Sequence, residues 1–281
     1  MKSRVYIIAM LLCCNLMAAM AQTGITILHT NDTHSCVMPL SEHLADTAVA
    51  GRGGYLRRLE MLKEEREKDP ELLYLDSGDF SQGSPYYTFY KGEVEVELMN
   101  RMRCDAAAIG NHEFDFGLEN LAALIKKANF PIVCANYDFT GTPLEGLVKP
   151  YVIIERKGVK IGVLGISTVL EGLVDKKNYG EVRYLDPIAT AKQVAGMLKK
   201  EKHCDVVICL SHLGWGIKGV NDNELMASTR HIDLVLGGHS HTNHKELQYV
   251  KNLDGQDIPN NQNGKSGIYV AKLMMTLKKE F

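Results

Sequence analysis

The sequence predicts a layered α/β fold, and three observations support this prediction. Short apolar segments with the character of buried strands alternate with amphipathic segments that have the spacing of helices. The chain has 281 residues, of which 45% are hydrophobic and 23% are charged, and this composition excludes a disordered or collagen-like chain. Two strand-like segments are joined by only two residues, which favours a mixed sheet over a purely parallel one.

Strands are predicted at short apolar runs along the whole chain. These runs are residues 24–32, 72–79, 106–111, 131–136, 159–167, 205–212, 232–240 and 267–281. Residues 151–166 have Lys157 and Gly158 between two strand-like halves and therefore predict a hairpin. The residues between His244 and Gly267 are rich in Asn, Gly and Lys, which indicates a surface loop.

Helices are predicted between these strands at three amphipathic segments, residues 55–68, 117–128 and 187–201. In the first of them Leu56, Leu59 and Leu62 fall on one side. The third begins with Asp186 and Pro187, a pair typical of a helix start. Strand and helix therefore take turns along the chain, as in an α/β fold.

Charge and cysteine content exclude further classes of protein. The chain has 32 Lys and Arg against 34 Asp and Glu, with no long run of one sign, which argues against binding of duplex nucleic acid. Two of the seven cysteines lie near the start of the chain, and the other five form no CxxC pair, so we expect no disulfide framework. Cys134 and Cys209 lie in apolar runs and are expected to be buried as small hydrophobic residues.

Residues 1–21 have the pattern of a cleaved secretory signal. Lys2 and Arg4 precede an apolar run at residues 5–20, and a small-x-small motif ends at Ala21. The run is shorter than the roughly 20 residues of a membrane-spanning helix. We therefore expect secretion across an inner membrane into a periplasm, with a retained N-terminal anchor and a lipid-modified cysteine as the alternatives.

Residue types that bind metals gather where the predicted strands end. In open α/β sheets, ligands collect outside the carboxyl ends of the strands, because the loops converge there. Five of the ten histidines of the chain lie at these ends, accompanied by Asp and Asn. The residues concerned are Asp32, His34, Asp79, Asn111, His112, His212, His239 and His241. We therefore expect a metal site at this edge of the sheet.

The candidate ligands fit two divalent ions better than one. Seven groups are too many for a four-coordinate site, and the lack of Cys among them argues against a structural zinc. If Asp79 bridges two ions, one ion takes Asp32, His34 and His241, and the other takes Asn111, His212 and His239. Such ions would lie roughly 3.5–4 Å apart and lower the pKa of a water between them towards about 7, which suits in-line hydrolysis of phosphate esters. The donor types admit Mn, Zn or Fe.

His112 and Asp115 are the candidate catalytic residues beyond the ions. His112 directly follows Asn111, so its side chain is expected to face a bound phosphate and to protonate the leaving group or neutralise developing charge. Asp115 is placed to accept the other ring N–H and fix the tautomer. The alternative is that Asp115 only caps a helix that begins near Gly117.

Five short blocks, in this order, resemble the signature of the calcineurin-like metallophosphoesterases. They are DTH at 32–34, GD at 78–79, GNHEFDFG at 110–117, SH at 211–212 and GGHSH at 237–241, and GNHEFD resembles the 5′-nucleotidase branch. The resemblance implies one such domain over residues 22–281, built as a four-layer α/β/β/α sandwich of two mixed β-sheets flanked by helices. It also implies the same seven metal ligands and the same catalytic pair, although His241 stands where many nucleotidases of the family carry Gln.

The function that this resemblance implies is two-metal hydrolysis of nucleotide phosphate monoesters, and the signal-like residues 1–21 add the expectation that the enzyme is secreted. One alternative is a phosphodiesterase or nucleotide-sugar pyrophosphatase, acting on a UDP-sugar or a 2′,3′-cyclic nucleotide at the same site. Another is a non-catalytic protein that binds metal and docks a partner.

Substrate recognition is open at this point. Nucleotidases of the family usually carry a C-terminal domain that holds the nucleobase, and the printed sequence stops at Phe281 without it. We expect either a separate polypeptide that carries this domain or acceptance of many phosphate esters. The aromatic cluster between Phe80 and Tyr90 either packs in a core or stacks on a base.

Overall fold

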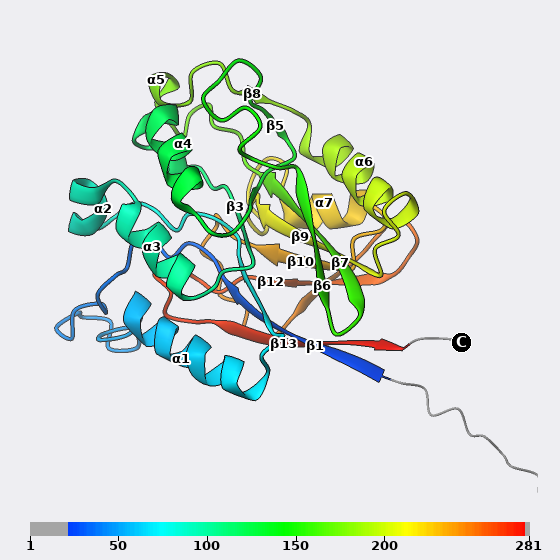
Figure 1. Cartoon of the computed structure of the whole chain (residues 1–281), viewed down its shortest axis with the longest axis horizontal. Helices are drawn as coiled ribbons and strands as arrows, with labels where there is room; N and C mark the ends of the chain where they lie inside the picture. Colours follow the sequence, from blue (N-terminus) through cyan, green and yellow to red (C-terminus); the bar gives the residue numbers. More distant parts are fainter. Residues whose placement is uncertain (1–21, 279–281) are drawn as a thin grey trace, which may run out of the picture.

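The computed structural model describes residues 22–278, so the predicted secretory signal lies outside the described residues. Two sheets form the centre of the molecule, and helices cover their outer faces (Figure 1). The fold class predicted from the sequence is confirmed.

The first sheet has the strand order β13-β1-β2-β3-β4. Strands β1 to β4 run parallel to one another, and β13 pairs with β1 in the antiparallel direction along nearly its full length. Their bounds are Gln22–Thr30 for β1, Leu73–Asp76 for β2, Ala106–Ala108 for β3, Ile132–Val133 for β4 and Ala271–Lys278 for β13. The carboxyl ends of the parallel strands therefore meet at one edge.

The second sheet has the strand order β11-β12-β10-β9-β7-β6 and is also mixed. Its bounds are Tyr151–Arg156 (β6), Val159–Ser167 (β7), Val206–His212 (β9), Leu234–Gly237 (β10), Gln248–Lys251 (β11) and Asp257–Asn261 (β12). The predicted hairpin is confirmed, because Arg156 pairs with Val159 across a turn in which Lys157 and Gly158 both have positive φ. A pair of short strands, β5 (Tyr137–Asp138) and β8 (Arg183–Tyr184), lies apart from both sheets.

Three apolar clusters separate four layers. Side chains such as Ile27 and Ile208 fill the space between the two sheets. Helices α1 (Tyr55–Lys68), α3 (Glu93–Arg101) and α4 (Gly117–Lys127) pack on the other face of the first sheet. Helices α6 (Pro187–Lys200) and α7 (Asp222–Ser228) cover the second sheet. Burial of apolar area on both faces of each sheet is the main stabilising contribution to this arrangement.

The remaining helical segments are short and lie in loops. They are α2 (Pro85–Tyr90), the 3₁₀ turn η1 (His112–Phe114) and α5 (Lys176–Tyr179). Local signals explain several helix starts: Asp186 accepts the N–H of Ala189 at the start of α6, and Ser84 accepts the N–H of Tyr87 at the start of α2.

The prediction of a surface loop between His244 and Gly267 is wrong. This segment forms strands β11 and β12, and it carries four consecutive buried amide side chains, Asn260, Asn261, Gln262 and Asn263. Their polarity suggested exposure, but their amides find hydrogen-bond partners inside the molecule, so burial leaves most of them satisfied. This correction matters because the segment lies beneath the loop that carries His239 and His241.

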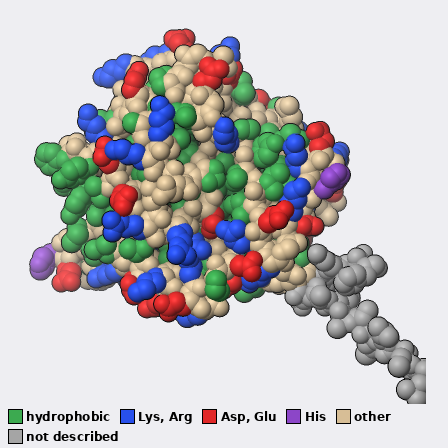
Figure 2. All heavy atoms as spheres, viewed as in Figure 1, with side chains coloured by type: hydrophobic (Ala, Val, Ile, Leu, Met, Phe, Trp, Pro, Cys, Tyr) green, Lys and Arg blue, Asp and Glu red, His purple; other side chains and the backbone are tan. Residues whose placement is uncertain are grey.

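The expected burial of Cys134 and Cys209 is confirmed. All five cysteines of the described segment are free and buried, Cys134 and Cys209 among them. Positive and negative side chains are interspersed on the face shown in Figure 2, without a continuous band of one sign. Within residues 22–278, no helix is both long and apolar enough to cross a membrane.

Candidate functional site

Loops that follow five strands bring the predicted site residues together. Asp32 and His34 follow β1, Asp79 follows β2, Asn111 and His112 follow β3, His212 ends β9, and His239 and His241 follow β10. Three overlapping groups have potential ligand atoms within 4.8 Å of one another. These groups are Asp32 with His34 and His241, His34 with Asp79 and His112, and Asp79 with His212 and His239.

The first group has the spacing of ligands around one cation. Nε2 of His34 lies 2.9 Å from Nε2 of His241, and these atoms lie 3.9 and 3.6 Å from Oδ1 of Asp32. Two imidazole nitrogens bound to one ion at about 2.0–2.1 Å and at right angles would lie about 3 Å apart. The observed separation therefore fits a metal site.

The third group, Asp79 with His212 and His239, leaves polar atoms without partners. Nε2 of His212 lies 3.0 Å from Oδ2 of Asp79, yet it makes no well-aligned hydrogen bond within the described part of the chain. The other ring nitrogen of His212 donates to the carbonyl of Ser77 at 2.7 Å, which fixes the ring. Oδ1 of Asn111 is likewise buried without a partner there. Buried polar atoms without hydrogen-bond partners fit a cation that is ligated by the side chains of Asp79, Asn111 and His212.

The electrostatics of the cluster also fit a cation. Burial raises the pKa of Asp32 to about 7, and the neighbouring carboxylate of Asp79 acts in the same direction. Burial alone would raise the pKa of Asp79 too, but the charge and hydrogen bond of His212, together with the charges of His112 and His34, outweigh it and lower the pKa. Burial lowers the pKa of His34 and of His239 to about 4, which keeps both imidazoles in the neutral form that binds metals.

His112 and Asp115 form a hydrogen-bonded pair beside the cluster. Nδ1 of His112 lies 2.9 Å from Oδ2 of Asp115, and the backbone N–H of His112 donates to Asp79 at the same distance. Burial would lower the pKa of His112, but the hydrogen bond to Asp115 and the charge of Asp79 raise it above its ordinary value. The alternative role of Asp115 as a helix cap is wrong, because α4 begins after Phe116 without a side-chain cap.

The backbone around Asp79 is held by a residue that the sequence analysis left without a site role. The buried carboxylate of Glu113 accepts the N–H groups of Asp79, Ser81 and Gly110 at 3.0, 3.1 and 2.7 Å. Gly110 also lets this loop approach closely, since a Cβ at that position would lie 2.1 Å from Oδ1 of Asp79. The glutamate inside GNHEFD was the signal that could have revealed this contact.

Gln262 is a second residue that sequence reasoning missed. Its side-chain amide donates to the carbonyl of Gly238 at 2.7 Å and accepts from the hydroxyl of Ser240 at 2.8 Å. Both partners lie in the loop that carries His239 and His241. Gln262 is fully buried, so its hydrogen bonds fix the course of this loop.

Below the cluster, His29 links β1 to the buried amides of the second sheet. Its ring contacts Asn261 at 3.0 Å and the hydroxyl of Ser77, also at 3.0 Å. Burial lowers the pKa of His29 to about 4. His244 packs its ring against Trp215 with 4.9 Å between the centroids.

Five of the seven candidate ligands have an unusual backbone conformation. Their φ values are positive: 48° for Asp32, 42° for His34, 53° for Asp79, 73° for His239 and 55° for His241. The chain therefore turns sharply at each of these residues, which brings side chains from separate loops to one point.

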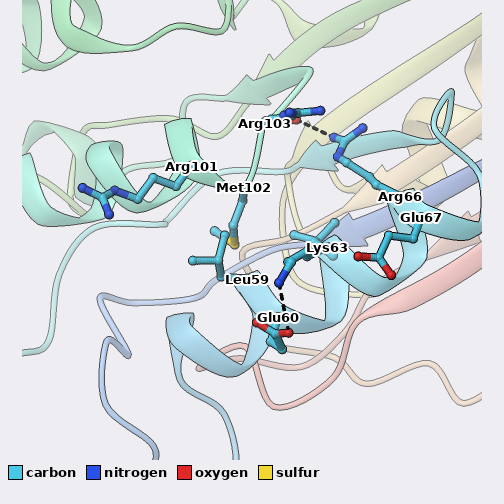
Figure 3. A pocket seen from close by; sticks show the side chains of 9 residues that line it. Leu59, Glu60, Lys63, Arg66, Glu67, Arg101, Met102 and Arg103 are labelled. Atoms are coloured by element: carbon cyan, nitrogen blue, oxygen red, sulfur yellow. Dashed lines mark hydrogen bonds and ion pairs between the residues drawn. The ribbon is translucent and has the colours of Figure 1, made fainter.

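A hollow of about 570 Å³ between α1 and the end of α3 offers no comparable chemistry (Figure 3). Lys63 lies 3.6 Å from Glu60, Arg66 donates to the carbonyl of Arg103 at 2.6 Å, and Arg101 points away from the side chains of α1. Within residues 22–278 the three groups of possible metal ligands all lie at the other site.

Comparison with known proteins finds similar nucleotidases and phosphoesterases. The chain is 34% identical to human 5′-nucleotidase over 241 residues, which cover 84% of this chain and 40% of the human protein. It is 31% identical over 261 residues to a trifunctional nucleotide phosphoesterase of Bacillus subtilis, covering 81% of this chain and 16% of that protein. The structure of a 5′-nucleotidase precursor from Thermus thermophilus superposes with a TM-score of 0.79 and 31% identity, over 91% of this chain and 54% of that one.

These matches cover a part of each relative, and the chain spans about 40% of the length of the human enzyme. Residues 25–243 match the calcineurin-like phosphoesterase family. This range contains all five blocks on which the sequence analysis based its resemblance. The chain therefore belongs to the calcineurin-like phosphoesterase family.

Proposed function

We propose that this chain is a metal-dependent phosphoesterase that hydrolyses phosphate monoesters of nucleotides with two divalent ions. The observation that carries the proposal is the set of three ligand groups, each with its ligand atoms within 4.8 Å of one another, which share His34 and Asp79 and lie beside the His112–Asp115 pair. Similarity to 5′-nucleotidases supports the choice of nucleotides.

The proposed ligand sets share one carboxylate. Asp79 would contact both ions, one of them held also by Asp32, His34 and His241, and the other by Asn111, His212 and His239. When bound, Mn, Zn or Fe would polarise the phosphoryl oxygens and lower the pKa of water at the site.

His112 is proposed as the general acid. Because Nδ1 donates to Asp115, Nε2 is the ring nitrogen left for the substrate. A raised pKa keeps more of the imidazolium form near neutral pH, so Nε2 can donate its proton to the leaving oxygen. Asp115 holds the ring in the required orientation and stabilises its positive charge.

Hydrolysis of AMP tests this proposal. Purified chain is stripped with a chelator, reloaded with Mn²⁺ or Zn²⁺, and assayed for phosphate release. We expect no release from the stripped protein, restoration by metal, and two ions per chain by elemental analysis. A single ion in fully active protein contradicts the two-metal proposal, and metal-loaded protein that hydrolyses no phosphate ester contradicts the enzymatic one.

Hydrolysis of diesters or nucleotide sugars is a second candidate function at the same site. The trifunctional nucleotide phosphoesterase among the relatives is the observation that favours it. Rates for bis(p-nitrophenyl) phosphate, UDP-glucose and a 2′,3′-cyclic nucleotide, measured beside the rate for AMP, decide between the two.

We also propose that the protein is exported to a periplasm, on the basis of the signal-like residues 1–21. Sequencing of the N-terminus of protein recovered from the periplasmic fraction tests this proposal. We expect the mature chain to begin at Gln22, and a chain that begins at Met1 contradicts cleavage.

A further inference from the structure

A cavity of about 700 Å³ opens directly beside the proposed catalytic centre. His34, His112 and His241 are part of its lining. A phosphate placed at the metal ligands would therefore have its leaving group directed towards the remaining space, on the side of the proposed general acid. The cavity is far larger than a phosphate and falls in the range of pockets that hold small organic molecules.

The rest of the lining combines apolar and polar groups. Val37, Met38 and Tyr86 supply an apolar surface, and Gln82 and Lys265 supply hydrogen-bond donors. An aromatic ring with polar groups nearby is how proteins hold a nucleobase together with its sugar. A bare sugar phosphate would use only the polar half of this surface.

The aromatic cluster of the sequence divides into three environments. Phe80 and Tyr87 are buried in the core, at 0% and 5% exposure, whereas Phe89 and Tyr90 are exposed, at 78% and 55%. Tyr86 alone among these five lines the cavity. Core packing therefore describes Phe80 and Tyr87, whereas base stacking is open to Tyr86.

The position of Tyr86 is fixed relative to the catalytic centre. Ser84 caps the helix on which Tyr86 lies, and its hydroxyl also contacts the hydroxyl of Ser35 at 2.5 Å. Ser35 follows the candidate ligand His34 and is bonded in addition to the buried carboxyl of Glu95 on α3. These contacts join the start of α2 to the loop after β1 that carries His34. The ring of Tyr86 is therefore preorganised for binding.

We propose that this cavity is the leaving-group site and that it selects nucleosides through stacking of the base on the ring of Tyr86. The inference rests on the proposed phosphoesterase function and adds the substrate class that this chain itself recognises. Tyr86 acts in substrate selection and takes no part in the chemical step.

Steady-state kinetics with AMP and ribose 5-phosphate test the proposal, because the two substrates share the phosphate and the ribose and differ in the base. For Tyr86→Ala we expect kcat/KM for AMP to fall about 5- to 100-fold through a higher KM, as expected for loss of one stacking contact. The value for ribose 5-phosphate should stay within about twofold of wild type, because that substrate has no base to stack. Tyr86→Phe keeps the ring and should restore the value for AMP.

Phe89→Ala is the matched control, since Phe89 lies on the same helix with its side chain exposed and outside the cavity lining. Phe89→Ala should leave kcat/KM for both substrates unchanged. An equal loss for AMP and ribose 5-phosphate in Tyr86→Ala, or no loss for either, overturns the proposal. If the wild type hydrolyses neither substrate, the proposed function itself fails. Calorimetric binding of adenosine to wild type and to Tyr86→Ala then tests the nucleoside site independently. No binding to wild type, or equal binding to both proteins, overturns the proposed nucleoside site.

Discussion

At the scale of single residues, neighbours in the chain have different roles. Asn111 offers a buried oxygen with no partner in the described chain, His112 pairs with Asp115, and Glu113 binds backbone N–H groups. One block of sequence thus supplies a candidate ligand, a candidate acid and a scaffold. These roles predict different consequences for substitution.

Replacement of His112 should separate catalysis from metal binding. His112→Ala is expected to retain both ions and to lose about 10²- to 10⁴-fold in kcat, the usual contribution of general acid catalysis. Asp79→Ala should lose metal as well as activity, because it removes the proposed shared ligand. Metal content and turnover are measured for both variants, with His203→Ala, an exposed histidine, as control. Equal metal loss in the two site variants contradicts this division.

At the scale of elements, the sequence was most informative where polarity and burial agree. Helix α1 has the predicted bounds, and the strand ends carry the predicted site residues. Helix α3 was not predicted, because EVEVE at its start alternates with the period of a strand. One oxygen of its buried Glu95 accepts a hydrogen bond from the distant Ser35, and the other has no partner within residues 22–278. β12 was mistaken for a loop for the related reason that its amides find their partners on other strands. Contacts of this kind cannot be read from local pattern.

Substitution of Gln262 tests whether the loop after β10, which carries His239 and His241, is positioned by the residue that follows β12. Gln262→Ala removes the hydrogen bonds that fix the loop of His239 and His241, so we expect metal affinity to fall about 10- to 100-fold. Metal titration of the stripped protein measures the affinity, and circular dichroism checks that the fold is retained. Gln256→Ala, at an exposed position between β11 and β12, should leave the affinity unchanged. Equal affinities in wild type and both variants contradict the positioning role.

At the scale of the whole molecule, buried carboxyl groups couple stability to pH. Burial raises the pKa of Asp222 from 3.8 to about 7, where it accepts a hydrogen bond from Ser211 at 2.5 Å. The folded state thus holds this proton more tightly than the unfolded state. Its stabilising contribution is complete below about pH 4 and is lost as the pH rises through about 7.

Asp222→Asn should remove this pH dependence. One proton corresponds to a slope of about 1.4 kcal/mol per pH unit in the free energy of unfolding, and an amide does not titrate. Asn260, whose oxygen has no partner in the described chain, can turn its amide to pair with the new side chain. Urea unfolding of both proteins between pH 4 and 7 measures the difference, and identical slopes would show that Asp222 is not responsible.

The left-handed turns at Asp32, His34, Asp79, His239 and His241 have a further consequence. A non-glycine residue in this conformation costs on the order of 1 kcal/mol, so the loops of the site carry conformational strain, and its candidate ligands account for five of the thirteen non-glycine residues with positive φ within residues 22–278. Glycine or asparagine at these positions would relieve the strain and delete the chemistry. Selection for heat resistance alone is therefore expected to enrich inactive descendants, unless each round of selection also screens for turnover.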